Sequence, residues 1–162
     1  MYQDKMAIIT FAPEYAEETV RMWRESKYQA IGVLETHNFE SHVYFLNHIL
    51  PKEFHIDIAL VDKKVVGIIA YNESHISQLY IHIAYQGLGI GKRLLERAKD
   101  QSTGRLTLYT FEINTKAQQF YESNGFKFVG SGHENEENLS DILYAWTAES
   151  ESGKISPFHS QN

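Results

Sequence analysis

Cysteine is missing from the 162-residue sequence. Its absence excludes disulfide bonds, a thiolate nucleophile and cysteine-ligated zinc, and it leaves the redox compartment open. Basic residues are in the minority, because 15 Lys and Arg stand against 21 Asp and Glu for a net charge of −6. Nothing in this charge favours nucleic acid or an anionic membrane as a partner, whereas a cationic small molecule would suit an acidic protein.

Long apolar runs are missing as well. No stretch approaches the roughly 20 residues of a membrane-spanning helix, and the N-terminal segment lacks the apolar core and small-residue cleavage site of a signal peptide. An apolar share of 43% and an aromatic share of 13% are typical of one globular domain. We therefore expect a cytoplasmic protein with one domain over residues 1–148 and a polar tail over 149–162.

The hydrophobic pattern predicts an α/β chain. Strands are expected at 6–11, 55–62, 64–71, 75–83, 105–111, 126–134 and 141–148. Helices are expected after Pro13, at 39–50 up to Pro51, from the glycine-rich loop to about Ser102, and at 115–124, with a loop over 28–38. The front half reads as largely antiparallel, with a hairpin at 55–71, which argues against a doubly wound sheet. The order predicts a mixed, mostly antiparallel sheet of about seven strands with about four helices.

Three glycines lie in five positions between a predicted strand and a predicted helix. Gly87, Gly89 and Gly91 leave bare backbone N–H groups at the positive end of the helix dipole, which is the usual setting for a bound phosphate. Lys92 and Arg93 follow in the first turn, where the dipole disfavours cations. A bound anion would offset both charges, so the loop indicates an anion site.

Two nucleotide motifs fit this loop poorly. A P-loop requires one more residue between its first glycine and the Gly-Lys pair, and Arg93 stands where its hydroxyl residue belongs. A dinucleotide fingerprint would place its third glycine one residue later. Glu112 nevertheless ends a strand at a tolerable distance from the loop, so a nicotinamide-dependent oxidoreductase stays open as an alternative.

The stretch from Gln86 to Gly91, QGLGIG, is similar to the Q/R-x-x-G-x-G/A signature of the GCN5-related N-acetyltransferase (GNAT) family. A second block at 108–130, LYTFEINTKAQQFYESNGFKFVG, resembles the strand, Asn-bearing turn and FYxxxGF helix that follow in this family. The predicted elements also keep the family's order, so the resemblance covers residues 6–148 and implies a single GNAT-like domain. One departure is Ile83, where many members carry proline.

The resemblance implies acetyl-CoA as co-substrate, no metal, and a primary amine on a small molecule or a peptide as acceptor, with a homodimer left open. The backbone of the loop would hold the pyrophosphate, the backbone of Ile81 and Ile83 would pair with the pantetheine arm, and Asn114 would meet the pantetheine or the thioester. The residues expected to bind the cofactor are Ile81, His82, Ile83, Gln86, Gly87, Leu88, Gly89, Ile90, Gly91, Lys92, Asn114 and Tyr121.

An amine that attacks a thioester generates an oxyanion and expels a thiolate. Without cysteine, direct transfer in a ternary complex is favoured over an acyl-enzyme. The resemblance places the hydroxyl of Tyr121 near the thioester sulfur, where it would donate a hydrogen bond or a proton. His75 stands where many members carry an acidic base, and Glu73 is the second choice. Deprotonation through a water chain is the alternative to both residues.

The acceptor pocket is expected from aromatic and polar residues near the first two helices and the last strands. The candidates are Tyr28, Glu35, His37, Tyr144 and Trp146. His42 and His48 are expected on a solvated or half-buried helix face, since no H-E-x-x-H pattern supports a metal site. A CoA-binding sensor without catalytic activity is a further alternative, against which the presence of Asn114 and Tyr121 argues.

Overall fold

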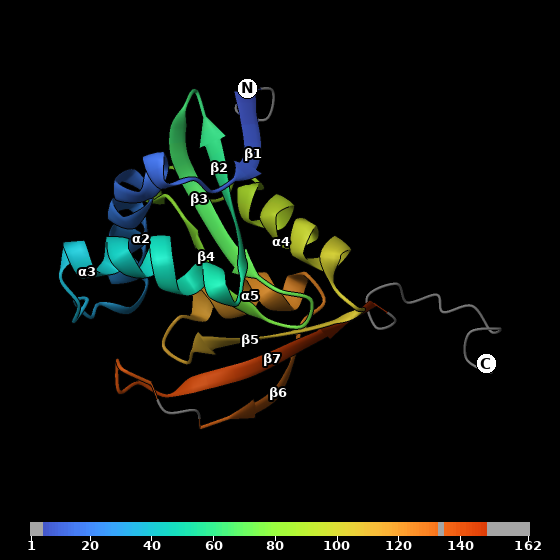
Figure 1. Ribbon diagram of the computed structural model, residues 1–162. Coiled ribbons are helices and arrows are strands. Elements are labelled where there is room, and N and C mark those ends of the chain that lie inside the picture. Colours follow the sequence, from blue (N-terminus) through green and yellow to red (C-terminus); the bar gives the residue numbers. More distant parts are fainter. Residues whose placement is uncertain (1–4, 133–134, 149–162) are drawn as a thin grey trace. The chain divides into compact units, whose positions relative to one another are not determined.

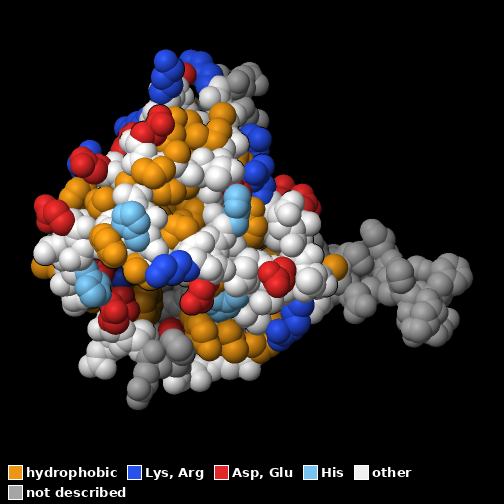
Figure 2. All heavy atoms as spheres, viewed as in Figure 1, with side chains coloured by type: hydrophobic (Ala, Val, Ile, Leu, Met, Phe, Trp, Pro, Cys, Tyr) orange, Lys and Arg blue, Asp and Glu red, His pale blue; other side chains and the backbone are white. Residues whose placement is uncertain are grey.

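The computed structural model describes residues 5–132 and 135–148, so the expected polar tail at 149–162 lies outside the described residues. These residues form two units (Figure 1). Unit 1 takes the described residues up to Asn72 together with Ile76–Gln101, and unit 2 takes Glu73–His75 and the described residues from Ser102 onward. On the face drawn in Figure 2, acidic and basic side chains are interspersed with histidine and apolar side chains.

Unit 1 contains an antiparallel sheet in the order β1-β2-β3-β4. Its strands are β1 (Met6–Thr10), β2 (His55–Val61), β3 (Lys64–Tyr71) and β4 (Ile76–Ile81). The predicted hairpin between β2 and β3 is confirmed, because Asp62 and Lys63 both adopt the positive φ values, 51° and 69°, of a tight two-residue turn. The two strands are buried along nearly their whole length, and Figure 1 shows α2 and α3 on one side of the sheet and α4 on the other.

The first helix of unit 1 is longer than predicted. After the short 3-10 turn η1 (Pro13–Tyr15), α2 (Ala16–Ile31) continues into the segment expected to be a loop from residue 28. Ile31 is buried and keeps the last turn in contact with the core. The helix ends at Gly32, whose φ of 72° is the left-handed conformation that glycine accepts.

The second predicted helix is divided into three pieces. Asn38 begins α3 (Phe39–Tyr44) by accepting a hydrogen bond of 2.8 Å from the backbone N–H of Ser41. The chain continues as a π-helical turn, η2 (Phe45–Ile49), and a 3-10 turn, η3 (Leu50–Lys52). Pro51 therefore lies inside the last turn and does not end the helix before it, since a 3-10 start tolerates a residue without an N–H group.

The core of unit 1 on the side of α2 and α3 is a single apolar cluster. Its buried members are Ala16, Val20, Met22, Trp23, Leu46, Leu50, Ile56, Ile58, Val65, Ile68 and Ala70. On the opposite side, α4 (Ile90–Gln101) buries Ile90, Leu94, Leu95 and Ala98. A Cβ at Gly67 would lie 3.0 Å from Ile81 Cδ1 and 3.1 Å from Leu94 Cδ1, so this glycine allows the helix to pack close to the strand.

A buried carboxylate joins β2, β3 and α4. Asp57 is 0% exposed, and its side chain accepts hydrogen bonds from Arg97 Nε at 3.0 Å, Tyr71 Oη at 2.9 Å and His55 Nε2 at 2.8 Å. Burial, together with the hydrogen bond to Asp57 and its negative charge, raises the pKa of Tyr71 to about 12. The phenol therefore remains a donor throughout the physiological range.

Unit 2 is built on a three-stranded antiparallel sheet in the order β5-β7-β6. Its elements are β5 (Arg105–Phe111), α5 (Thr115–Ser123), β6 (Lys127–Ser131) and β7 (Asp141–Thr147). Gly125, with a φ of 91°, follows the end of α5 as predicted. Strand β6 ends at Ser131 and is shorter than the predicted strand, of which residues 133–134 lie outside the described residues. His75 forms a parallel bridge with Thr107 of β5.

The expected fold class is confirmed: the described residues form a mixed α/β chain with four α-helices and seven, mostly antiparallel, strands in sheets of four and three. No helix in the described ranges is both long and apolar enough to cross a lipid bilayer.

We predict that the ion pair of Asp57 and Arg97 is a major contribution to the stability of unit 1. Arg97→Met would leave a fully buried carboxylate without its cation, and such a loss costs about 3–5 kcal/mol in a fully buried pair. Because the Arg97 side chain is 44% exposed, we expect the free energy of unfolding in urea to fall by about 2 kcal/mol.

A double-mutant cycle with Asp57→Asn identifies the pair as the cause. The double variant should be more stable than the sum of the two single effects by at least about 1 kcal/mol. Arg93→Met, on the same helix and exposed, is the matched control and should change stability by less than about 0.5 kcal/mol. Additive effects in the cycle would contradict the prediction.

Candidate functional site

The glycine-rich loop lies between β4 and α4, as predicted. Gly87 and Gly89 adopt φ values of 80° and 89°, which side chains rarely accept, and a Cβ at either position would find no heavy atom within 4 Å. The first helical hydrogen bond of α4 runs from Arg93 N–H to Gly89 O at 3.2 Å. The backbone N–H groups before Arg93 therefore belong to the first turn, which has no acceptors within its own helix. This arrangement suits an anion.

The strand that leads to this loop ends two residues earlier than predicted. Strand β4 stops at Ile81, and Ile83–Tyr85 form a 3-10 turn, η4. The carbonyl oxygen of Ile81 accepts hydrogen bonds from Ser26 Oγ at 2.9 Å and Gln86 Nε2 at 3.0 Å. The side chain of Gln86 thus fastens the loop to the strand end, a contact that the sequence did not predict.

The start of β4 also differs from the prediction. The strand begins at Ile76, and its register with β3 shifts so that Ile76 pairs with Tyr71 and Gln78 pairs with Ala70. Ser77 is the extra residue of this irregularity. The expected alternation therefore does not carry from Leu79 back to His75.

His75, a candidate base, is fixed within unit 2. Its Nδ1 lies 2.8 Å from Thr107 Oγ1, and its ring lies edge-on to that of Tyr109 at 6.1 Å between centroids. Glu73, the second candidate, is exposed, and its backbone carbonyl accepts a hydrogen bond of 3.1 Å from Thr103 N–H.

Asn114 and Tyr121 lie at the start and in the last turn of α5. The Asn114 side chain caps the helix by accepting a hydrogen bond of 3.1 Å from Ala117 N–H. The Tyr121 side chain is buried and packs edge-on against the rings of Phe120 at 5.2 Å and Phe126 at 5.6 Å between centroids. Both residues thus have a structural role in unit 2 in addition to the expected role toward the cofactor.

The expected acceptor residues fall into two groups, one in each unit. Tyr28 is exposed on α2 and His37 is exposed in the connection to α3, whereas Glu35 forms an ion pair of 3.1 Å with Lys27. Both side chains of this pair are only 12% exposed, so the negative charge of Glu35 is already compensated by Lys27. The carbonyl oxygen of His37 accepts a hydrogen bond of 2.8 Å from Arg24 Nη1.

Tyr144 and Trp146 form the second group, on β7. Both are buried. The Tyr144 hydroxyl donates a hydrogen bond of 2.7 Å to Glu122 Oε2. Burial, with this hydrogen bond and the Glu122 charge, raises the pKa of Tyr144 to about 12. The phenol thus acts within unit 2 as a neutral link between β7 and α5.

His42 is a buried residue that sequence reasoning placed on a solvated or half-buried face. It is 6% exposed, its ring is edge-on to Trp23 at 4.4 Å between centroids, and its Nδ1 lies 3.4 Å from Arg24 Nη1. Burial lowers the pKa of His42 to about 4, and the positive charges of Arg24 and Lys27 act in the same direction against Glu35. No spacing in the sequence signals this, because the environment comes from α2, which is distant in the chain.

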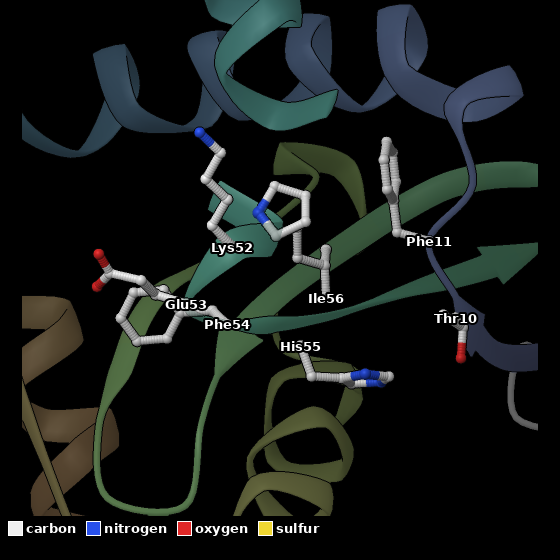
Figure 3. A pocket seen from close by; sticks show the side chains of 8 residues that line it. Thr10, Phe11, Lys52, Glu53, Phe54, His55 and Ile56 are labelled. Atoms are coloured by element: carbon white, nitrogen blue, oxygen red, sulfur yellow. The ribbon is translucent and has the colours of Figure 1, made fainter. Parts of the chain in front are cut away.

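A separate groove of about 410 Å³ opens at the ends of β1 and β2. It is lined by Thr10, Phe11, Pro51, Lys52, Glu53, Phe54, His55 and Ile56. Figure 3 shows Phe11 and Ile56 pointing toward the helices on one side of the sheet and His55 pointing to the opposite side. None of the residues expected to bind cofactor or acceptor lines this groove. Within the described ranges, no group of three or more potential metal ligands is brought together.

Comparison with known proteins identifies the class to which this arrangement belongs. A family model described as an acetyltransferase (GNAT) domain matches residues 11–146. The peptidyl-lysine N-acetyltransferase YjaB of Salmonella typhimurium is 34% identical over 124 residues, which are 72% of this chain and 80% of that protein.

Solved structures agree in fold. The apo form of YjaB from Escherichia coli has a TM-score of 0.71 at 24% identity, with 87% of this chain and 97% of that chain covered. An acetyltransferase from Thermus thermophilus has a TM-score of 0.73 at 23% identity, with 91% and 99% covered. The PaiA N-acetyltransferase from Thermoplasma acidophilum, solved with coenzyme A, has a TM-score of 0.68 at 22% identity, with 88% and 98% covered.

The chain is thus an acyl-CoA-dependent N-acyltransferase. It belongs to the GNAT family of acetyltransferases, as the two sequence blocks predicted, and its reaction transfers the acetyl group of acetyl-CoA to a primary amine. The nicotinamide-dependent alternative is set aside by this membership.

The buried His42 predicts a loss of stability in acid. The pKa of His42 falls from 6.5 to about 4 on folding. The stability contribution of the neutral ring is therefore fully present above pH 6.5 and is lost progressively as the pH falls from 6.5 to about 4. The difference corresponds to about 3 kcal/mol. We expect urea unfolding at pH 7 and pH 4.5 to show a smaller difference in stability for His42→Gln than for the parent protein. His48→Gln, at an exposed position, is the control and should behave as the parent. The same pH dependence in His42→Gln would contradict the prediction.

Proposed function

We propose that this enzyme acetylates the side-chain amine of lysine in a peptide, with the pyrophosphate of acetyl-CoA bound by the backbone of residues 86–91. The observation that carries the cofactor part is the open glycine loop directly before α4, with Gly87 and Gly89 at positive φ. The acceptor part is supported by the 34% identical relative, which is named as a peptidyl-lysine N-acetyltransferase.

The loop suits a doubly charged pyrophosphate because backbone N–H groups and the helix dipole act together. Lys92 and Arg93 are exposed in the first turn of α4, where a bound anion would offset their unfavourable interaction with the dipole. We assign Leu88 of the loop, together with Ile90 and Gly91 in the first turn of α4, to the same backbone site.

The pantetheine arm is assigned to the backbone at the end of β4. His82 N–H donates to Val66 O on β3 at 2.8 Å, so by alternation the N–H of Ile81 points away from β3. The Ile81 carbonyl already accepts two hydrogen bonds, which uses both of its lone pairs. We therefore infer that Ile81 serves the pantetheine as a donor through its N–H, and that Ile83 adds a backbone contact.

The chemical step is a direct attack. The lone pair of the acceptor amine forms the new C–N bond at the thioester carbonyl, the C–S bond breaks, and the thiolate leaves with the bonding electron pair. We assign the Tyr121 hydroxyl as the group that donates a hydrogen bond or proton to the thiolate, and Asn114 as a contact to the pantetheine or thioester.

His75 is the proposed acceptor of the amine proton. Thr107 Oγ1 donates to the Ser74 carbonyl at 3.4 Å and lies 2.8 Å from His75 Nδ1. With the hydroxyl proton used in this way, His75 donates from Nδ1, and the lone pair of the ring is at Nε2, as a base requires. Glu73 is the second choice, because its exposed carboxylate lies two residues away.

The proposed acceptor surface lies at the exposed Tyr28, Leu34 and His37. Aromatic and apolar side chains would contact the aliphatic part of a lysine side chain and its peptide. The ion pair of Glu35 with Lys27 removes one carboxylate from recognition of the ammonium group. Glu35 therefore shapes the connection between α2 and α3. Tyr144 and Trp146 are buried on β7 of unit 2, so we do not propose that their side chains form part of this exposed surface.

Gly89→Val tests the cofactor site. The φ of 89° at this position is unfavourable for any side chain, so the turn must change. We expect the Kd for acetyl-CoA, measured by calorimetry, to rise at least about tenfold while the domain stays folded. Gly130→Ala is the matched control, because Gly130 lacks positive φ and its Cβ would meet only ordinary contacts at 4.0 Å. Unchanged affinity in folded Gly89→Val would locate the anion elsewhere.

The acceptor is tested with a peptide that carries one lysine and a blocked N-terminus. We expect mass spectrometry to show transfer of one acetyl group to this peptide and none to the same peptide with norleucine in place of lysine. Acetylation only of small amines or of free N-termini would overturn the lysine assignment and leave the acetyltransferase activity intact. No turnover with any amine would favour the CoA-binding sensor.

The same assay tests the proton path. His75→Ala should lower kcat/KM most at low pH, where few amines are neutral, and the deficit should narrow as the pH rises. Glu73→Ala should have a smaller effect. A deficit that is uniform across pH would make His75 a positioning residue, and no deficit would favour a water chain.

A further inference from the structure

The corner between β4 and the glycine loop, residues 81–86, is held by hydrogen bonds within itself and to residues of α2 and β3. Ile81 O is fixed by Ser26 and Gln86. His82 N–H donates to Val66 O at 2.8 Å, and its carbonyl accepts from Tyr85 N–H at 2.8 Å. Every one of these contacts lies in unit 1, and together they set the direction in which the chain enters the loop.

The His82 side chain adds a further hydrogen bond within this corner. Its Nδ1 accepts a hydrogen bond of 3.0 Å from Ala84 N–H, and its φ and ψ values, −51° and 134°, are non-helical, as in a residue that precedes a helical turn. Serine, threonine, aspartate or asparagine usually caps such a turn. The His82 ring also lies edge-on to Tyr85 at 5.2 Å, and Lys64 Nζ lies 5.6 Å from the centre of the Tyr85 ring.

We propose that His82 is a positioning residue for acetyl-CoA: its neutral imidazole caps the turn η4 and thereby orders the loop at 86–91, and protonation of the ring releases this turn. The inference rests on the proposed function, because it assumes that this loop holds the cofactor. It assigns to the His82 side chain a role distinct from the expected backbone contact.

The cap requires the neutral ring. Nδ1 accepts from Ala84 N–H only through its lone pair, so the proton of the neutral imidazole is at Nε2, and a second proton at Nδ1 would face the Ala84 N–H. Burial lowers the pKa of His82, and the Lys64 charge on β3 acts in the same direction. Glu18 and Glu25 on α2 oppose this shift. The contribution of the cap is therefore complete above the ordinary histidine pKa of about 6.5 and is lost as the pH falls below it.

The test compares the parent protein with His82→Ala and His82→Asn. The Asn side chain keeps an acceptor but does not titrate, so it should retain the parent Kd for acetyl-CoA at pH 7.5 within about threefold. His82→Ala should raise the Kd about fivefold at this pH, as expected for the loss of a cap worth about 1 kcal/mol. In the free proteins, hydrogen exchange of the Ala84 amide should be faster in His82→Ala than in the other two.

The pH dependence separates a cap from a charge contact. Between pH 7.5 and 5.5 the parent should lose affinity relative to His82→Asn, a ratio from which the titration of the cofactor's own phosphate cancels. A gain in affinity of the parent relative to His82→Asn would show that His82 contacts the phosphate as a cation and would overturn the proposal. An unchanged Kd in His82→Ala would overturn it as well.

A matched control is available at another side-chain cap of unit 1. Asn38→Ala removes an equivalent hydrogen bond of 2.8 Å at α3 and should lower stability without changing the Kd for acetyl-CoA. A parallel change in Kd would attribute the His82→Ala effect to general destabilisation. Failure of the proposed function is recognised separately: acetyl-CoA affinity would survive Gly89→Val, whereas Ala84 exchange in the free protein reports on the cap alone.

Discussion

The arrangement of unit 1 depends on the hydrogen bonds that the carboxylate of Asp57 accepts. It is fully buried, and each of its donors comes from a different place: His55 from its own strand, Tyr71 from β3 and Arg97 from α4. Burying a charge in this way is tolerated only when the surrounding groups satisfy it. Since α4 begins at the glycine loop, the contact that fastens its C-terminal half also limits where its N-terminal turn, and any anion bound there, can lie.

Three further histidines have different environments in this chain, and the role of each depends on the partner of its Nδ1 atom. Nδ1 of His42 faces Arg24 in a buried position, Nδ1 of His75 lies beside the hydroxyl of Thr107, and Nδ1 of His82 accepts a backbone N–H. Burial lowers the pKa of the first, and the backbone N–H of Ala84 sets the tautomer of the third. The residue type alone therefore predicts little about chemistry, and the partner of the ring decides it.

The sequence was sufficient for the class of fold and for the loop, because both depend on local signals. Glycine at 87 and 89 is required by positive φ, and the hairpin at 62–63 follows from a short connection between two apolar runs. It was insufficient where the outcome depends on how neighbouring elements pair and pack. The extra residue at Ser77 exists only in the register with β3, and the ion pair that occupies Glu35 requires the turn of α2 that carries Lys27. Both changed the interpretation of the candidate site.

The absence of a side chain at Gly67 sets the spacing between β3 and α4. The closest atoms to the missing Cβ are the Cδ1 atoms of Ile81 and Leu94, at 3.0 and 3.1 Å, so a methyl group at this position would require these side-chain ends to move away by a few tenths of an ångström or to be replaced by smaller ones. The identities of residues 67, 81 and 94 should therefore covary among related chains. A relative with alanine at the first position is expected to carry a shorter side chain at one of the other two.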